Sequence, residues 1–230
     1  MTDTLGSRRA ATTALGFGAL VVLLLANIVI TISLDDGSAI TRASQVVVSG
    51  LALVLVGIGA RVPARLSQGM NLVAVVVVVG GVSVVAIGLD ERIPATTEVA
   101  AAAVYTLAVI GCTIRVLRDE RVTIGTLFGA LSVYLLLANA FASTFGAIQG
   151  ITGDPFFTEV GGAASPGDFL YYSLTTLTTL GYGDFTAASS AGRSVSALEA
   201  VVGQLFLATF VARTVGAFNR SRQTGGSQGP

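Results

Sequence analysis

The segment Pro166–Asp184 combines residue types that can hold a cation in apolar surroundings. Pro166 and Asp168 predict a helix start, because proline fits a first turn and an acidic side chain complements the positive helix end. A threonine-rich stretch then leads into Gly181–Gly183. The helix would direct its partly negative end inward, where aimed carbonyl groups stabilise a cation. Because glycine enters left-handed backbone without a penalty, the following strand can turn successive carbonyl groups to one side.

Residue types on which many enzymes rely are absent or scarce. The 230 residues include thirteen basic and thirteen acidic side chains, no histidine and one cysteine, Cys112. Every basic residue is an arginine, so neither a Schiff-base lysine nor a histidine base or metal ligand is available. A single cysteine cannot build a thiolate metal site or an intrachain disulfide. We therefore expect neither an enzyme nor an organic cofactor, and the zero net charge gives no sign of a nucleic-acid partner.

The elements that must position this segment are membrane spans. Hydrophobic residues form 53% of the chain and charged residues 11%, far fewer charges than soluble domains carry. Six uncharged or nearly uncharged stretches approach or exceed the length of about 20 residues that a bilayer core requires. A further stretch, Phe169–Gly183, is too short to span and predicts a re-entrant segment buried in protein. The predicted spans are Ala10–Leu34, Ala43–Ala60, Leu66–Leu89, Pro94–Ile114, Val122 to beyond Gln149, and Arg193–Ala217.

The arginines indicate an orientation. With a cytoplasmic N-terminus, six crossings place ten of the thirteen arginines inside and only Arg42, Arg92 and Arg193 outside, as the positive-inside rule requires. An odd number of crossings would put arginine clusters on the wrong side. We therefore expect a multi-pass protein of an inner or plasma membrane with both termini in the cytoplasm. The lack of lysine and the Ala, Val, Gly and Arg bias favour a prokaryotic source.

The sequence resembles the tetrameric potassium channels, whose filter reads Thr-Val-Gly-Tyr-Gly, in the motif formed by Thr179, Leu180, Gly181, Tyr182 and Gly183. The resemblance covers Val122–Ala217 and extends more loosely to the six-span layout of voltage-gated-like channels. It implies an all-α membrane protein with six transmembrane helices, a re-entrant pore helix and a selectivity filter, assembled as a homotetramer with three identical subunits in a lipid bilayer. The implied parts are a cytoplasmic N-terminus (1–9), a four-helix sensor-like domain (10–117), a pore domain (118–218) and a disordered tail (219–230).

The resemblance also implies roles for residues in and behind the filter. Backbone carbonyls from Thr179 to Tyr182, with the Thr179 hydroxyl, would replace the water around potassium ions, while Gly183 lets the strand turn outward and Asp184 bonds behind it. Two tyrosines, Tyr171 and Tyr172, stand where relatives often carry tryptophans, so we expect Tyr172 to bond Tyr182. Where some relatives have a glutamate, this chain has Thr175.

The last predicted span carries gating candidates. Gly203 lies 20 residues after Gly183, where relatives have a hinge glycine, and close packing against the re-entrant helix is the alternative. Four residues of this span follow a helical spacing and share one face, which we expect to line the cavity and the cytoplasmic gate. Ordinary core packing would produce the same spacing. This stripe consists of Gln204, Leu207, Val211 and Val215.

Polar residues inside the predicted spans require partners. Glu199 is a carboxyl within the membrane, which is costly when charged. We expect it to bond a hydroxyl of the re-entrant helix, with an effect of its protonation on gating, or else to lie near the outer interface. Asn27 and Asn139 are expected to form interhelical hydrogen bonds. The hydroxyls available to Glu199 are those of Thr175, Thr176 and Thr178.

The fourth predicted span lacks the charges of a voltage sensor. Such sensors place three or four arginines per subunit in the membrane field, whereas Val99–Ile114 contains none. Arg115, Arg118 and Arg121 follow at the cytoplasmic end, where the positive-inside rule accounts for them. We therefore expect a voltage-insensitive potassium channel that conducts passively. The alternatives are a weakly selective monovalent cation channel, a secondary ion transporter, which the lack of an inverted repeat disfavours, or a membrane scaffold.

Overall fold

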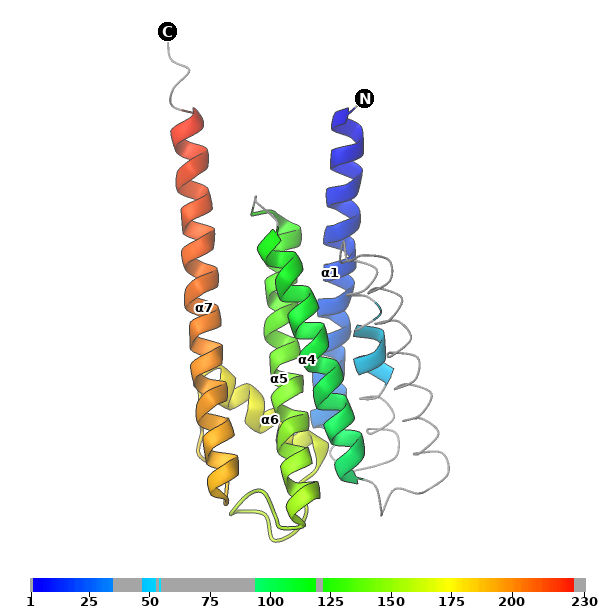
Figure 1. Cartoon of the computed structure of the whole chain (residues 1–230), viewed down its shortest axis with the longest axis vertical. Coiled ribbons are helices and arrows are strands. Elements are labelled where there is room, and N and C mark those ends of the chain that lie inside the picture. Colours follow the sequence, from blue (N-terminus) through cyan, green and yellow to red (C-terminus); the bar gives the residue numbers. More distant parts are fainter. Residues whose placement is uncertain (1, 35–46, 53, 55–93, 119–121, 226–230) are drawn as a thin grey trace.

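The computed structural model describes residues 2–34, 47–52, 54, 94–118 and 122–225. Its regular elements are helices, and a single isolated β-bridge pairs Phe157 with Ala187 among the described residues. In Figure 1 the helices of residues 2–33, 94–118 and 124–152 lie side by side, the helix of residues 190–225 runs along one flank, and the short helix of residues 166–177 lies across them. In chain order the helices are α1 (Thr2–Ser33), α4 (Pro94–Arg118), α5 (Ile124–Thr152), α6 (Pro166–Leu177) and α7 (Ser190–Gly225).

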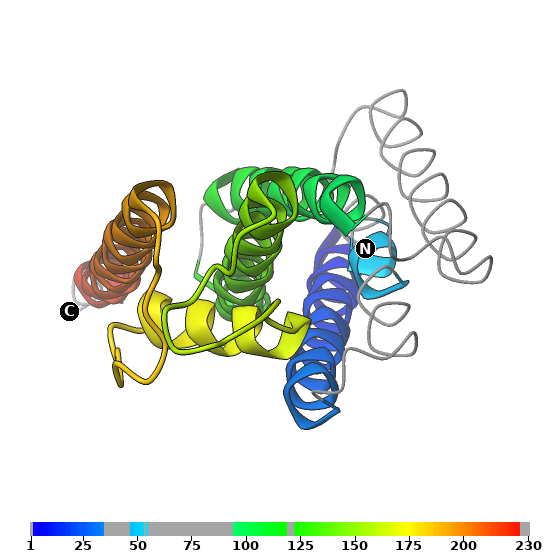
Figure 2. The ribbon, with the colours of Figure 1, turned by 90° about the horizontal axis from the view of Figure 1, so that it is seen from below.

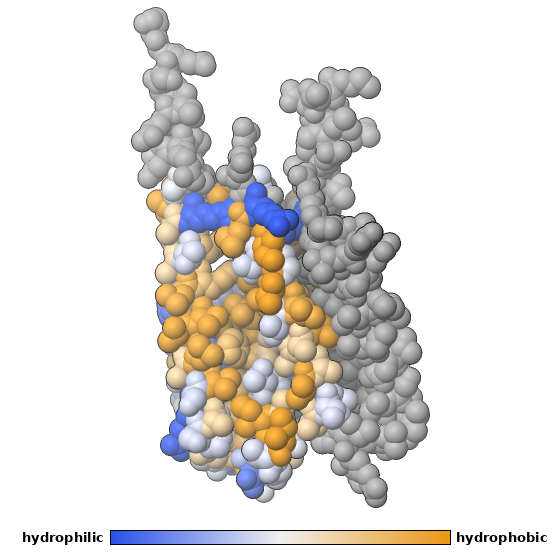
Figure 3. All heavy atoms as spheres, viewed as in Figure 1, coloured by the Kyte–Doolittle hydropathy of each residue, from blue (hydrophilic) through white to orange (hydrophobic). Residues whose placement is uncertain are grey.

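Four of these helices are long and apolar enough to cross a membrane. They contain the candidate spans Ala14–Ser33, Ala95–Arg118, Ile124–Thr152 and Ser190–Gly216. On the face shown in Figure 3, hydrophobic residues form a broad band and strongly hydrophilic residues gather toward its two ends. Such a surface suits a bilayer, so the chain is a multi-pass membrane protein. The predicted spans at 43–60 and 66–89 lie outside the described residues, apart from 47–52 and 54.

The helix α5 is the centre of the described fold. Both α1 and α4 pack against it, and Leu24, Tyr105 and Leu136 from the three helices are buried in their common core. Asn27 Nδ2 of α1 donates to Asn139 Oδ1 of α5 over 3.1 Å. The expected interhelical role of these asparagines is thus confirmed. A buried amide pair fixes the rotation of one helix against the other, because either partner left alone would be costly to bury.

Local sequence signals explain where α5 begins and ends. Thr123 is its N-cap, and a capping box joins Thr123 to Thr126 through reciprocal side-chain and backbone hydrogen bonds. This cap places the helix start two residues after Val122, the predicted beginning of the span. Gly153 ends α5 with a left-handed φ of 75°, the conformation that favours glycine after a helix.

The last helix extends further than the sequence indicates. We predict a disordered tail from residue 219, but α7 continues as helix through Gly225. Residues 219–225 contain no proline, and extending a formed helix by one residue is far easier than nucleating a new one. At the other end of the chain α1 is helical from Thr2, so residues 2–9 are continuous with the first span.

The short helix α6 holds the candidate site in place. It contacts α1, α5 and α7, and Figure 2 shows it lying across the bundle between α1 and α7. Its 12 residues make a helix of about 18 Å, too short to cross a bilayer. Ser165 caps its start, with Asp168 N donating to Ser165 Oγ over 3.0 Å and Ser165 N donating to Asp168 Oδ2 over 2.8 Å. The helix start predicted from Pro166 and Asp168 is confirmed.

Candidate functional site

The chain reverses direction at the end of α6. Thr179 N donates to Thr176 O over 2.9 Å, and Leu180 N donates to Thr175 O over 2.8 Å. These are the two bonds of a Schellman motif, which requires a left-handed residue directly after the cap. Thr179 takes that place with φ 60°, the only positive φ of a non-glycine residue in the described parts of the chain. A β-branched residue there is strained.

Every second residue of the motif has left-handed backbone. Thr179, Gly181 and Gly183 have φ values of 60°, 50° and 79°, while Leu180 and Tyr182 between them have none. Gly181 N also donates to Thr175 O over 3.1 Å, so three successive N–H groups turn back toward the end of α6. In a trans peptide the carbonyl points opposite to the N–H of the next residue. The carbonyl groups of Thr178, Thr179 and Leu180 therefore point away from α6.

The motif lies on the surface of the single chain. All residues from 178 to 184 are exposed, with Leu180 55% exposed and Tyr182 67%. Large apolar side chains and outward carbonyl groups are thus exposed together in this motif. One chain supplies only one side of any site that these carbonyl groups could form.

A side chain of α7 reaches the first residue of the motif. Gln204 Nε2 donates to Thr179 Oγ1 over 3.3 Å. Sequence reasoning places Thr179 in a filter and Gln204 on a cavity stripe, and the structure brings the two together. The other stripe members Leu207, Val211 and Val215 are 38%, 57% and 54% exposed. Residues on other faces of α7 are exposed to a similar extent, so exposure does not single out the stripe. Their role as a cavity lining stays a prediction.

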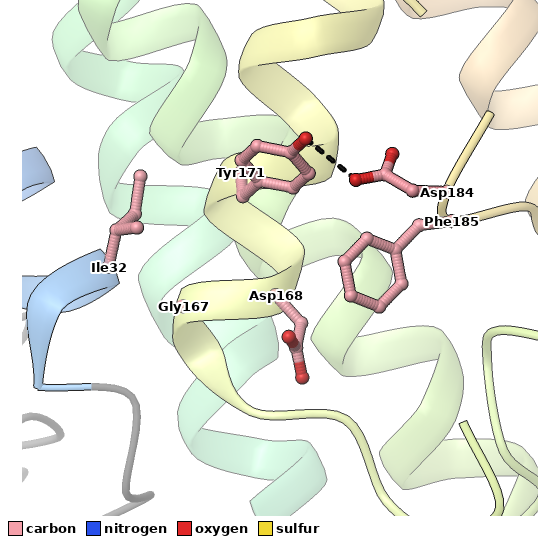
Figure 4. Close-up of a pocket in the computed structure, with 6 residues that line it drawn as sticks. All are labelled: Ile32, Gly167, Asp168, Tyr171, Asp184 and Phe185. Atoms are coloured by element: carbon pink, nitrogen blue, oxygen red, sulfur yellow. Dashed lines mark hydrogen bonds between the residues drawn. The ribbon is translucent and has the colours of Figure 1, made fainter. Parts of the chain in front are cut away.

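Tyr171 supports the far end of the motif. Its hydroxyl donates to Asp184 Oδ2 over 2.7 Å. This bond and the charge of Asp184 raise the pKa of Tyr171 to about 12, because both favour the protonated phenol over the phenolate. Figure 4 shows both residues beside a pocket of about 280 Å³ that Ile32 of α1 and Phe185 also line. Asp168 in the same pocket caps its own helix, so both carboxylates already have donors.

Tyr172 has a different partner from the one expected. Its hydroxyl donates to Ser196 Oγ of α7 over 2.9 Å, and a phenol has only one proton to donate. The predicted bond to Tyr182 is therefore not made within this chain. The ring of Tyr172 packs edge-on against Phe145, Phe156 and Phe157 at centroid distances of 5.3, 6.1 and 5.0 Å. This aromatic cluster packs α6 against α5 and against the loop that connects the two helices.

The loop between α5 and α6 is held by side chains that sequence reasoning missed. Gln149 Oε1 accepts from Phe156 N at 3.2 Å and from Ala164 N at 3.0 Å. Glu159 accepts from the hydroxyls of Thr158 and Thr186 and from Thr186 N. These hydrogen bonds, that of Thr158 first, lower the pKa of Glu159 to about 2. The loop is thereby fastened to the segment that follows the motif.

Glu199 lies on α7 and contacts α6, but at another hydroxyl than predicted. Ser173 Oγ lies 2.5 Å from Glu199 Oε1 and 2.8 Å from Ala138 O of α5. The expected partners Thr175 and Thr178 instead donate to carbonyls of their own helix, at 3.0 and 2.7 Å. Glu199 is fully buried within the chain, and its depth relative to the outer interface stays a prediction.

Gly203 permits a close contact of α7 with the end of α6. A Cβ atom there would lie 2.5 Å from Leu177 O and 2.9 Å from Leu177 Cδ1. The same carbonyl accepts from the Tyr134 hydroxyl of α5 over 2.9 Å. This geometry accounts for the glycine through packing. Its role as a hinge stays a prediction.

The part of the chain that contains this motif is similar to known proteins. A family model described as an ion channel matches residues 122–220. Protein LctB of Bacillus caldotenax is 34% identical over 109 residues, which are 45% of this chain and 80% of that protein. No solved structure matches the chain. The residues matched by the family model contain α5, α6, the whole Thr179–Gly183 motif and most of α7.

Proposed function

This chain belongs to the ion channel family, and from that premise we propose that it conducts potassium ions passively through a pore completed by four copies of the chain. The observation that carries the proposal is the alternating backbone of Thr179–Gly183, with left-handed φ at every second residue. Such backbone gathers the N–H groups on one side. The carbonyl groups on the other side are the ligands that replace the hydration shell of K⁺ in filters.

The surrounding elements support a cation site. The C-terminal end of α6 carries partial negative charge and leads directly into the motif. The proposed ligands are the carbonyl oxygens of Thr179, Leu180, Gly181 and Tyr182 with the Thr179 hydroxyl. In this proposal α6 is the pore helix, Gly183 lets the strand leave the filter, and α7 is the inner helix. No organic cofactor and no nucleic acid takes part.

The exposure of the motif supports assembly. A ring of carbonyl ligands around an ion cannot come from one strand, and residues 178–184 are exposed in the single chain. Three identical subunits would cover Leu180 and Tyr182 and complete the ring. Both termini lie in the cytoplasm of a prokaryotic cell in this proposal, with the loop between α5 and α6 outside.

Ion flux into vesicles tests the proposal. Purified protein in liposomes should dissipate a potassium gradient and leave an equal sodium gradient standing. Gly181→Ala places a side chain at φ 50°, which is strained for alanine, and should abolish the flux. The matched control is Gly162→Ala, because a Cβ atom there would have no neighbour within 4 Å.

Three results would argue against the proposal. Equal potassium and sodium flux would mean a weakly selective cation channel, and slow saturable flux would mean a transporter. Undiminished potassium flux through Gly181→Ala would contradict the role of the alternating backbone.

A further inference from the structure

Three helices meet at the hydroxyl of Ser173, behind the candidate filter. Ser173 belongs to α6, its Oγ lies 2.8 Å from the backbone carbonyl of Ala138 in α5, and it lies 2.5 Å from Glu199 Oε1 in α7. Ser173 and Glu199 are both fully buried. The proton that belongs in each of these two contacts can be assigned from the chemistry of the groups.

The carbonyl of Ala138 can only accept a hydrogen bond, and a serine hydroxyl has one proton. The contact of Ser173 with Ala138 O therefore uses the serine proton. The contact of Ser173 with Glu199 Oε1 then needs a second proton, which an ionised carboxylate does not have. A protonated carboxylic acid supplies it and donates to a lone pair of the serine oxygen.

The other oxygen of Glu199 supports the same assignment. Glu199 Oε2 is buried and has no hydrogen-bond partner among the described residues. A carboxylate would leave this charged oxygen without a donor in apolar surroundings, at a high cost in free energy. A bifurcated serine proton would satisfy neither acceptor well and would do nothing for Oε2. A neutral acid leaves only a weakly polar carbonyl unpaired.

We propose that Glu199 is a proton-bearing carboxylic acid that donates to Ser173 and thereby holds α6 between α5 and α7. It acts as a positioning residue, because Ser173 lies six residues before the start of the motif and Glu199 lies four residues, about one helical turn, before Gly203. Its effect on conduction rests on the proposed channel function, whereas the presence of the proton does not.

Titratable groups of α5, α6 and α7 on the described helices around this contact donate to other partners. On α5 the Tyr134 hydroxyl donates to Leu177 O. On α6 the Tyr172 hydroxyl donates to Ser196. On α7 the Arg193 guanidinium donates to the carbonyls of Ala187 and Ala188. None of these bonds supplies a donor to Glu199, so the carboxyl group keeps its own proton.

Infrared difference spectroscopy of the purified full-length protein at neutral pH tests the proton directly. The wild type minus Glu199→Gln should show the carbonyl band of one protonated carboxylic acid per chain. Ser173→Ala should shift that band by removing its hydrogen-bond partner. The control is Glu159→Gln, since a carboxylate with a pKa of about 2 should contribute only an ionised band. Loss of an ionised band in Glu199→Gln would overturn the proposal.

Conduction tests the positioning role. Glu199→Gln keeps a neutral donor of the same shape and should conduct like the wild type at every pH. Glu199→Leu keeps the volume but loses the donor, and should lower the open probability by about fivefold, as expected for one lost buried hydrogen bond. Tetramers of normal size in both variants would show that folding is intact. Wild-type conduction by Glu199→Leu would contradict the positioning role.

The two proposals can fail separately. A wild type that carries no potassium current would contradict the proposed function, while the infrared band would still decide whether Glu199 holds a proton.

Discussion

Thr179 concentrates several demands in one residue. Its φ of 60° costs a β-branched residue about 1–3 kcal/mol, and a glycine would avoid that cost. The left-handed backbone allows the two hydrogen bonds that end α6, and the hydroxyl accepts from Gln204. A glycine would lose this hydroxyl, which is one of the proposed ligands of the ion.

Glu159 gives a prediction about pH at the outer loop. Hydrogen bonds from Thr158 and Thr186 lower its pKa from an ordinary 4.5 to about 2. A carboxylate with a lowered pKa stabilises the folded state above its unfolded pKa, and this stability is lost as the pH falls through the folded value. The thermal midpoint of the wild type should therefore fall more than that of Glu159→Gln between about pH 5 and pH 2.

The control for this prediction is Asp154→Asn, which changes an exposed carboxyl of the same loop. Parallel profiles for Glu159→Gln and the wild type would show that the Glu159 bonds do not stabilise the fold.

The helix α6 is held by hydrogen bonds and close contacts at both ends and along its buried side. The capping box of Ser165 and Asp168 fixes its start, Ser173 binds α5, and Leu177 receives the Tyr134 hydroxyl while it contacts Gly203. A helix so held can keep the direction of the carbonyl groups that follow it.

Gly203→Ala should disturb this arrangement. The added Cβ atom would lie 2.5 Å from Leu177 O, so α7 must move away from α6. Overpacking of this kind costs about 1–3 kcal/mol, and we expect less stable tetramers together with a loss of current. Melting of the tetramer followed by size exclusion measures the first effect.

Gly216→Ala on the same helix is the matched control, because nothing lies within 4 Å of its added Cβ. A Gly203→Ala protein with unchanged melting and reduced opening would favour a hinge over the packing role.

The charges of α4 predict its response to voltage. Val99–Ile114 contains no arginine, and Arg115 and Arg118 lie in the last turn of the helix. The Arg115 guanidinium also stacks on the Phe17 ring of α1 at 5.4 Å. Replacing both arginines with glutamine should leave the slope of opening against voltage unchanged, as measured by stepping the voltage across a planar bilayer. A flatter slope in the double variant would make α4 a voltage sensor.

Several features of the helices can be predicted from local sequence signals. The start of α6 can be predicted from Pro166 and Asp168, and the asparagine pair from polar residues in apolar spans. The partner of Glu199 could not be chosen from propensity alone, because it depends on the rotation of α6 about its axis. The spacing of Phe169, Leu170, Ser173 and Leu177, all buried, is the helical signal that would have favoured Ser173.

Other features depend on contacts between distant segments. A β-bridge joins Phe157 to Ala187, and the Gln149 side chain accepts from the backbone N–H of Phe156. Both contacts use backbone groups, which carry no sequence signature. Likewise, the length of α7 beyond residue 219 follows from helix propagation, whereas composition alone suggests a tail.

At the scale of the whole molecule, the single chain is an open structure. Its described helices present apolar surface suited to lipid. The motif after α6 forms an exposed side with the large side chains of Leu180 and Tyr182. The apolar part of α7 is also largely uncovered, with only 17% of it buried in the single chain. Four copies around one axis would cover this side and leave the lipid-facing surface outward.

The reversal potential of single channels in a planar bilayer, with potassium on one side and sodium on the other, tests the central claim most directly. The proposed filter predicts unitary currents that reverse near the potassium equilibrium potential. Reversal near zero with equal concentrations of the two cations would contradict potassium selectivity, even if the pore conducts.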